Sequence, residues 1–434
     1  MLAFLESFNT FLWSGPVLLL LSGTHLLFTL RLHFPQRLTF RAIRLSVTPE
    51  DASGSEKGLS GFATLATTLA ATLGTGNIVG VSTAIALGGP GALFWCWVTG
   101  IFGMATSYAE CYLSGLYKKV RPDGTTVGGP MYVLEHGLGK KSLAVVYAFC
   151  TLFAAFGVGC TTQANAIAEA AASCWHLSPH IVGIAAATFA GIVVVGGIRS
   201  IGNFCVKIVP VLGFFYIGCC ILLLFLNRNA LPAAISLILD RAFHPGAAIG
   251  GFVGSTLQST LRFGIARGLF TNESGIGTAA IAAAASNSSP RRQGLISMTA
   301  VFWDTVVMCA LSGIVVVANI INRPASVQGV TAGNLTLAAF GVLPGGEMLL
   351  SIALAAFALT TMIGWCYFGE KGAEYLFGGR GIPVYHFLYI VMAYLGAVIP
   401  MGLVWGFTDL INGIMVFPNI IALFLLRRQI HPPS

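Results

Sequence analysis

The chain has 434 residues, of which 56% are hydrophobic and only 9% charged, and its mean hydropathy is +0.83. Soluble globular proteins have about 25% charged residues, so this composition excludes that class and indicates a polytopic helical membrane protein. The formal net charge of +8 does not indicate a nucleic-acid-binding protein, because the basic residues lie in loops between apolar segments.

Apolar stretches of about 20 residues, the length that crosses a bilayer as a helix, follow one another along the chain. Eleven spans are predicted near residues 11–30, 61–87, 91–117, 141–173, 178–197, 203–226, 247–285, 293–320, 347–376, 383–401 and 405–426. We therefore expect an all-α fold. Because no basic residue precedes the first span, we expect this span to be retained rather than cleaved as a signal.

The basic residues gather in alternate loops. Those predicted on one side are Arg31, Arg37, Arg41, Arg44, Lys57, Lys118, Lys119, Arg121, Lys140, Lys141, Arg199, Lys207, Arg291, Arg292, Lys371, Arg380, Arg427 and Arg428. The opposite loops contain only Arg228, Arg241 and Arg323. Because basic loops stay in the cytoplasm, we expect the N-terminus outside and the C-terminus inside, in a bacterial inner membrane.

Two of the predicted spans contain residues that interrupt helices. The segment from Gly58 to Leu87 carries Gly74-Thr75-Gly76-Asn77, and the segment from Ala247 to Ala285 carries Gly264, Gly268, Gly275 and Gly277. Unwound backbone at membrane depth survives only where protein or a polar cavity receives its polar groups, and a pair of such segments indicates the binding site of a secondary transporter.

The interrupted spans are the first and the sixth of the ten that follow the first span. Each therefore begins a group of five helices, and because five is odd, the second group starts from the opposite side of the membrane. This spacing predicts an inverted repeat. We expect an extra helix and loop at residues 1–57, one repeat at 58–226 and a second at 227–434.

The first interruption offers two kinds of binding group. The N–H groups of Thr75, Gly76 and Asn77, at the positive end of the resumed half-helix, suit an anion such as a carboxylate. The free carbonyls near Ala70 and Leu73 suit a hard cation such as sodium. Anion and cation sites are thus expected side by side.

Polar residues in other spans have two interpretations each. The hydroxyls of Thr360 and Thr361 either bond back to their own helix or bind the cation. Gln163 either binds a zwitterion or joins helices by a hydrogen bond, and Trp365 is a candidate pocket wall.

The clear cases of charged residues deep within the predicted spans are Glu110, Arg267, Glu273 and Asp304. Such charges are usually paired or functional. For Glu273, at the second interruption, an ion pair with Arg262 or Arg267 is as well supported as a substrate contact.

Several sequence blocks together resemble the alanine or glycine:cation symporter family, the sodium:alanine symporters. They are Gly74-Thr75-Gly76-Asn77-Ile78, Gly88-Gly89-Pro90-Gly91-Ala92-Leu93-Phe94-Trp95-Cys96-Trp97, Gly128-Gly129-Pro130-Met131-Tyr132, Phe270-Thr271-Asn272-Glu273-Ser274-Gly275-Ile276-Gly277 and Gly364-Trp365-Cys366-Tyr367-Phe368-Gly369-Glu370. The family usually has Met at position 96, Ser at 271 and 360, and Ala at 274. None of these departures removes a predicted ligand type.

The resemblance implies a helical bundle similar to LeuT, with one helix added before ten, and alternating access around a midplane site. It implies symport of alanine or glycine with sodium as the coupling ion and no other cofactor. The implied substrate residues are Thr75, Gly76, Gln163, Trp365, Phe270, Thr271 and Glu273. The implied sodium shell is formed by the carbonyls of Ala70, Leu73 and Phe357 and the hydroxyls of Thr360 and Thr361.

Two other classes are weighed against this one. A proton-coupled carrier of the same fold would use Glu110, Glu273 or Asp304. A membrane-embedded enzyme would need a nucleophile-base or metal constellation, but the sequence has no HExxH, no GxSxG and, we expect, no histidine within a span paired with a carboxylate.

Overall fold

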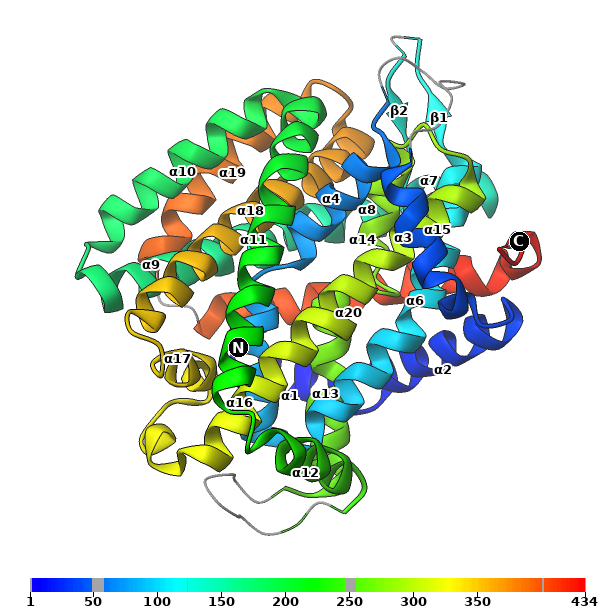
Figure 1. The fold of residues 1–434 in the computed structure, drawn as a ribbon. Helices are drawn as coiled ribbons and strands as arrows, with labels where there is room; N and C mark the ends of the chain where they lie inside the picture. The colour runs from blue at the N-terminus through cyan, green and yellow to red at the C-terminus, as the bar shows by residue number, and fades with distance from the viewer. Residues whose placement is uncertain are drawn as a thin grey trace.

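The computed structural model describes residues 2–48, 58–122, 124–244, 246, 255–399 and 402–433. Lys57 and residues 247–254 of the predicted seventh span lie outside the described residues. Within them the chain is mainly helical, and its only sheet is the antiparallel pair β1 (Lys119–Val120) and β2 (Thr126–Val127) (Figure 1).

The helices follow in this order: α1 (Leu2–Ser14), α2 (Pro16–Arg31), α3 (Thr39–Val47), α4 (Gly61–Thr72), α5 (Val81–Gly88), α6 (Ala92–Tyr117), α7 (Pro130–Tyr132), α8 (Lys141–Phe156), α9 (Thr162–Trp175), α10 (Pro179–Val195), α11 (Gly197–Leu226), α12 (Leu231–Phe243), α13 (Leu257–Asn272), α14 (Thr278–Ala284), α15 (Pro290–Val301), α16 (Ala310–Asn322), α17 (Leu335–Phe340), α18 (Gly346–Phe377), α19 (Gly381–Val398) and α20 (Gly402–Leu425).

The all-α membrane architecture is confirmed. Among the described residues, eight helices are long and apolar enough to cross a membrane, and the bent pair α4 and α5 makes a ninth crossing. The shorter helix α10 and the divided pair α13 and α14 occupy the other two predicted positions. The count of eleven stays a prediction.

The first predicted interruption is present. Helix α4 ends at Thr72, a π-helical segment follows at Gly76–Gly80, and the two half-helices are bent by 54°. A Cβ atom at Gly74 would lie 2.7 Å from the Thr361 hydroxyl oxygen on α18. Glycine therefore allows the unwound chain to approach α18 closely.

The second interruption lies between α13 and α14. Glu273, Gly275 and Gly277 have φ angles of 54°, 93° and 94°, in the left-handed region that ends a helix. The prediction that Gly264 and Gly268 also break the helix is wrong. Both lie within α13, where the absence of a side chain lets α13 pack against the backbone of α6.

The two interrupted spans run antiparallel to each other. At one end, the Leu59 N–H donates to the Ala285 carbonyl at 2.9 Å, so the start of the first span meets the end of the second. At the other end, the Thr260 hydroxyl donates to the Gly88 carbonyl at 2.7 Å. This is the arrangement that an inverted repeat produces, and it brings the two interruptions together.

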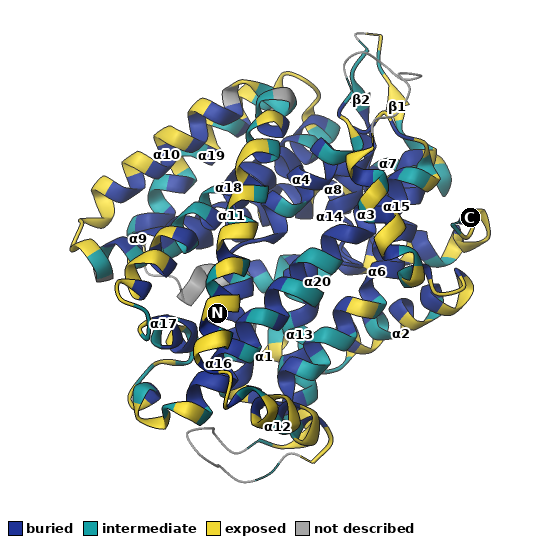
Figure 2. Ribbon diagram, viewed as in Figure 1, coloured by how far each residue is buried: buried dark blue, intermediate teal, exposed yellow. Residues whose placement is uncertain are grey.

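Burial follows this arrangement. Helices α4, α14 and α18 lie in the interior and are mostly buried, whereas α10 and α12 expose much of their surface (Figure 2). Two further spans contain π-helical segments, at Gly157–Thr161 and Phe302–Cys309. Such segments leave backbone groups out of register and are frequent at functional sites.

Candidate functional site

A cavity of about 740 Å³ reaches the first interruption from the end of the molecule where α6 begins. It lies between the π-helical turn after α4 and helices α5, α9, α13 and α18. Of the predicted substrate residues, Thr75, Gly76 and Phe270 line this cavity. We refer to it below as the vestibule.

Gly76 joins the two interruptions at the end of the vestibule. A Cβ atom at Gly76 would lie 3.0 Å from the Thr271 methyl group and 3.9 Å from the Phe270 ring. Both residues belong to the last turn of α13. The structure thus brings together predicted residues that are almost 200 positions apart in sequence.

Gln163 and Trp365 lie behind the first interruption and are buried. The Gln163 amide donates to the Val158 carbonyl at 3.1 Å, and its oxygen lies 3.5 Å from where a Gly74 Cβ atom would be. Among the described residues, the Gln163 oxygen has no hydrogen-bond partner, whereas the Trp365 indole faces the Glu273 carboxylate. Buried polar atoms are normally paired, so the Gln163 oxygen is available to a polar ligand.

Asn77 is predicted as an anion donor through its backbone N–H, and this N–H donates to the Gly74 carbonyl at 3.3 Å. Its amide oxygen accepts from the Gly74 N–H at 3.0 Å, and its amide nitrogen donates to the Asp304 carboxylate at 2.7 Å. The side chain is 1% exposed. Asn77 therefore holds the unwound chain against the π-helical segment of Asp304 and does not face the vestibule.

The carboxylates near the second interruption hold its backbone in place. Glu110 on α6 accepts from the Gly275 N–H, and Asn419 donates to the Gly275 carbonyl at 2.9 Å. Glu273 accepts from the Thr278 hydroxyl at 2.5 Å. Among the described side chains, Glu273 forms no ion pair with Arg262 or Arg267, so that expectation is wrong; α13 directs both arginines elsewhere.

Of the predicted sodium shell, Ala70 and Leu73 lie at the end of α4, and Phe357, Thr360 and Thr361 lie on α18. The Thr361 hydroxyl lies 3.2 Å from the Leu73 carbonyl, and the Thr360 hydroxyl lies 2.8 Å from the Phe357 carbonyl of its own helix. All five residues are at least 97% buried. The arrangement places neutral oxygens from two elements close together.

The Ala70 carbonyl also lacks its helical donor. In an uninterrupted helix it would accept from the N–H of residue 74, but the Gly74 N–H donates to Asn77 instead. Hard cations such as sodium favour oxygen ligands of this kind. The interruption thus diverts the helical donor of a carbonyl that the sequence predicts as a cation ligand.

Two charged residues line the vestibule, Glu169 and Arg267. Glu169 is absent from the residues predicted from the sequence, and Arg267 is predicted only as a possible ion-pair partner, not as part of a cavity wall. Thr162, Asn165 and Glu169 line it from α9 at helical spacing. The signal was present, because continuing a period of 3.6 residues from Thr162 leads to Glu169. The Arg267 side chain lies against Gly80 and over the Phe270 ring.

The opposite end of the molecule is closed by a cluster of charges beside the β1–β2 hairpin. Arg121 and Lys371 both contact the Glu374 carboxylate, the latter at 2.8 Å. The His386 imidazole lies 3.0 Å from the Glu370 carboxylate. The expectation that no histidine within a span pairs with a carboxylate is therefore wrong, because α18 and α19 place these residues together.

Two solved structures show which fold this chain has. A Na+-coupled sialic acid symporter in its substrate-bound outward-open state matches with a TM-score of 0.57 and 13% identity, covering 96% of this chain and 98% of that one. MhsT in complex with L-phenylalanine matches with a TM-score of 0.56 and 16% identity, covering 86% and 90%. The protein therefore has the LeuT-like fold of a membrane transporter.

The family follows from the sequence comparisons. The model of the sodium:alanine symporter family matches residues 1–432. The sodium/alanine symporter AgcS of Methanococcus maripaludis is 43% identical over 96% of this chain and 93% of its own length. The putative sodium/proton-dependent alanine carrier YrbD of Bacillus subtilis is 35% identical over 98% and 90%. The chain belongs to the sodium:alanine symporter family and is a multi-pass membrane transporter, not an enzyme.

Proposed function

We propose that the protein is a symporter that carries a small neutral amino acid, alanine or glycine, together with sodium. The observation that carries this proposal is the meeting of the two interruptions at the end of the vestibule, where the Gly76 backbone lies against Thr271 and the Thr361 hydroxyl lies beside the Leu73 carbonyl. A zwitterion needs donors for its carboxylate and acceptors for its ammonium group, and a coupling cation needs oxygens beside them.

In this proposal the substrate carboxylate is bound by the N–H groups of Thr75 and Gly76. The ammonium group is received by the carbonyls of Phe270, Thr271 and Glu273. The unpaired Gln163 oxygen completes the pocket, since a bound ligand would satisfy it, and the Trp365 ring forms a wall. Asn77 supports the site by fixing Gly74.

Sodium is bound by the carbonyls of Ala70, Leu73 and Phe357 and by the hydroxyls of Thr360 and Thr361. Because Leu73 directly precedes the unwound chain, cation binding there orders the N–H groups that bind the carboxylate. Such coupling is reciprocal and typically amounts to about 1 to 3 kcal/mol. No further cofactor is required.

The two ends of the molecule suggest how access alternates. The vestibule opens at the end predicted to face outside, and the charge cluster around Glu374 lies among the basic loops predicted to face the cytoplasm. The proposed cycle closes the first and opens the second. This orientation places the N-terminus outside and the C-terminus in the cytoplasm of a bacterium, with repeats at 58–226 and 227–434.

The experiment is uptake of labelled L-alanine by proteoliposomes with an inward sodium gradient against matched potassium, and with glycine and D-alanine as competitors. Accumulation that requires sodium supports the proposal and ranks the substrates. Accumulation driven by a proton gradient without sodium would contradict it and would transfer the coupling to Glu110, Glu273 or Asp304.

A further inference from the structure

A second pocket, of about 310 Å³, lies on another side of α4, between α3, α4, α11 and the π-helical segment Phe302–Cys309. Ser46 and the Trp303 indole are the only polar side chains among the described residues that line it. Its volume is at the lower end of the range of about 300 to 1,000 Å³ that ligand pockets usually have. We call it the lateral pocket.

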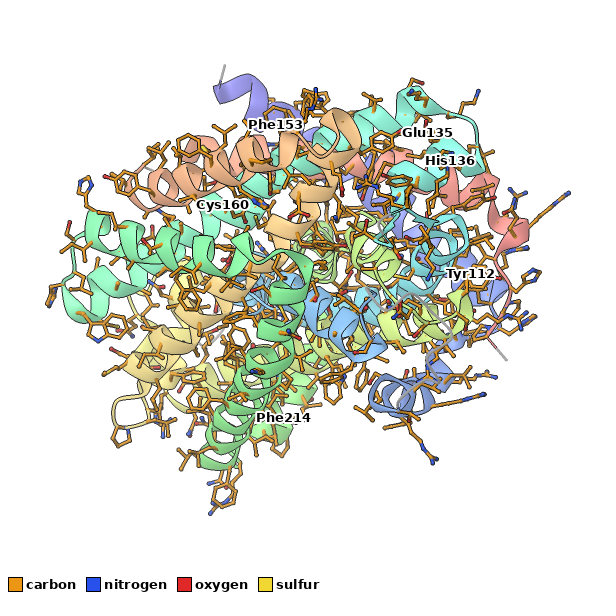
Figure 3. The ribbon with its side chains drawn as sticks, turned by 90° about the horizontal axis from the view of Figure 1, so that it is seen from above. Tyr112, Glu135, His136, Phe153, Cys160 and Phe214 are labelled. Atoms are coloured by element: carbon orange, nitrogen blue, oxygen red, sulfur yellow. The ribbon has the colours of Figure 1, made fainter. Side chains whose placement is uncertain are left out.

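The lateral pocket opens toward the surface that a bilayer would cover. Phe214, which lines it, is 70% exposed, and the neighbouring Val211 is 65% exposed. Phe214 projects from α11 at the edge of the molecule (Figure 3). An apolar occupant can therefore enter from the hydrocarbon region without crossing water.

Room for this occupant is provided by a glycine. Gly213 lines the lateral pocket, and a Cβ atom added there would meet no other atom within 4 Å. Glycine in a helix interior costs about 1 kcal/mol relative to alanine. Packing between helices does not require a glycine at this position, in contrast to Gly264 and Gly268.

Basic residues lie beside the pocket at the end predicted to be cytoplasmic. Helix α3, which contributes Ile43 and Val47 to the lining, exposes Arg44 together with Phe40, the mixture found in helices that lie in a membrane interface. Lys207 is exposed on α11 one turn before Pro210, which also lines the pocket. Cytoplasmic leaflets carry anionic lipids that basic residues near the membrane attract.

We propose that the lateral pocket binds one acyl chain of an anionic phospholipid whose headgroup is held by Arg44 and Lys207. An acyl chain matches the apolar walls and the lateral opening, and a phosphate group matches the two cations. A neutral apolar molecule would not explain why an exposed basic residue lies within one helical turn of the pocket lining on both α3 and α11.

This lipid site would be connected to the proposed cation site through Leu73. The Leu73 side chain lines the lateral pocket, and its carbonyl accepts from the Thr361 hydroxyl. A bound chain therefore restrains the end of α4 that carries a proposed sodium ligand. Lipid binding itself does not depend on the proposed transport function, whereas an effect on the sodium midpoint does.

The test compares Gly213→Phe with Gly218→Phe. Both glycines lie on α11 and have open space around the Cβ position, but only Gly213 lines the lateral pocket. Each protein is reconstituted in nanodiscs of phosphatidylglycerol and phosphatidylcholine, and the lipids retained after detergent extraction are counted by native mass spectrometry. We expect wild type and Gly218→Phe to retain phosphatidylglycerol and Gly213→Phe to lose it.

Equal retention by the two phenylalanine variants would overturn the site. Equal retention of phosphatidylcholine by wild type, or an unchanged preference in Arg44→Gln/Lys207→Gln, would overturn the anionic headgroup. A change from dimer to monomer in Gly213→Phe without loss of lipid would show that the pocket is a contact between two copies, which also contradicts the proposal.

A second measurement does not depend on folding of the phenylalanine variants. Trp303 lines the lateral pocket, so phosphatidylglycerol with brominated acyl chains should quench its fluorescence in wild type. We expect Trp303→Phe to remove the most strongly quenched component. Identical quenching in both proteins would overturn the proposal whether or not the protein transports alanine.

Discussion

Replacing Thr361 by Val is the sharpest test of the proposed cation site. The substitution keeps the branched shape of a fully buried side chain but removes the hydroxyl that lies 3.2 Å from the Leu73 carbonyl. A contact between a neutral oxygen and a charged group contributes at least about 1.5 kcal/mol. Because 1.4 kcal/mol corresponds to a tenfold change, we expect the sodium concentration at half-maximal uptake to rise by about tenfold or more.

The assay is labelled L-alanine uptake by proteoliposomes over a series of external sodium concentrations. At saturating sodium, the alanine concentration for half-maximal uptake should return close to that of wild type, because the substrate groups are intact. Thr361→Ser keeps the hydroxyl and should shift the sodium midpoint by less than about threefold. An unchanged sodium midpoint in Thr361→Val, with weaker alanine binding instead, would refute the assignment of this residue to the cation.

Three further predictions concern other parts of the molecule. Gly76→Ala places a Cβ atom 3.0 Å from the Thr271 methyl group. Since one methyl group is worth about 1 to 3 kcal/mol in a pocket, this substitution should weaken alanine uptake more than glycine uptake. Gly23→Ala, which has open space around its Cβ position, is the control, and equal losses of alanine and glycine uptake would argue against the site. Asn77→Leu leaves the Gly74 N–H and the Asp304 carboxylate without their hydrogen-bond partner, the Asn77 amide. Leaving a buried polar group unpaired costs about 1 to 3 kcal/mol of stability, so the unfolding temperature in detergent should fall. Asn165→Leu on the vestibule wall is the control and should leave the unfolding temperature nearly unchanged. Glu374→Gln removes the carboxylate that Arg121 and Lys371 share. Trypsin should therefore cleave the β1–β2 hairpin faster than it does in wild type or in the control Glu347→Gln. An unchanged cleavage rate would show that the charge cluster does not hold the hairpin end of the molecule closed.

The sequence predicted much of the architecture because a bilayer leaves the backbone few choices. Apolar stretches had to become helices, and the polar break at Gly74–Asn77 had to lie where protein receives its N–H and C=O groups. The same reasoning failed for Gly264 and Gly268, because a glycine that permits close helix packing and one that breaks a helix look alike in sequence. Of the four glycines, only Gly275 and Gly277 have left-handed backbone, and they follow Glu273, the left-handed residue that ends α13.

The site itself was predicted as two separate sets of residues. The chemistry of each set follows from local features: free N–H groups begin a half-helix, and free carbonyls end one. Sequence alone could not place Thr271 against Gly76 or Thr361 against Leu73, because contacts between residues far apart in the chain depend on how helices cross. The same limit explains why the pair of His386 with Glu370 was missed.

Composition, span lengths, the basic loops and the two interruptions therefore come from the sequence by itself, since each reflects the cost of exposing polar groups to lipid. The tertiary structure decided how the two interrupted spans lie against each other, which side chains remain unpaired and where the cavities are. These depend on the packing of whole helices. Asn77 shows the difference: its sequence position indicates a binding site, but the approach of Asp304 from a distant π-helical segment assigns its amide to the support of that site.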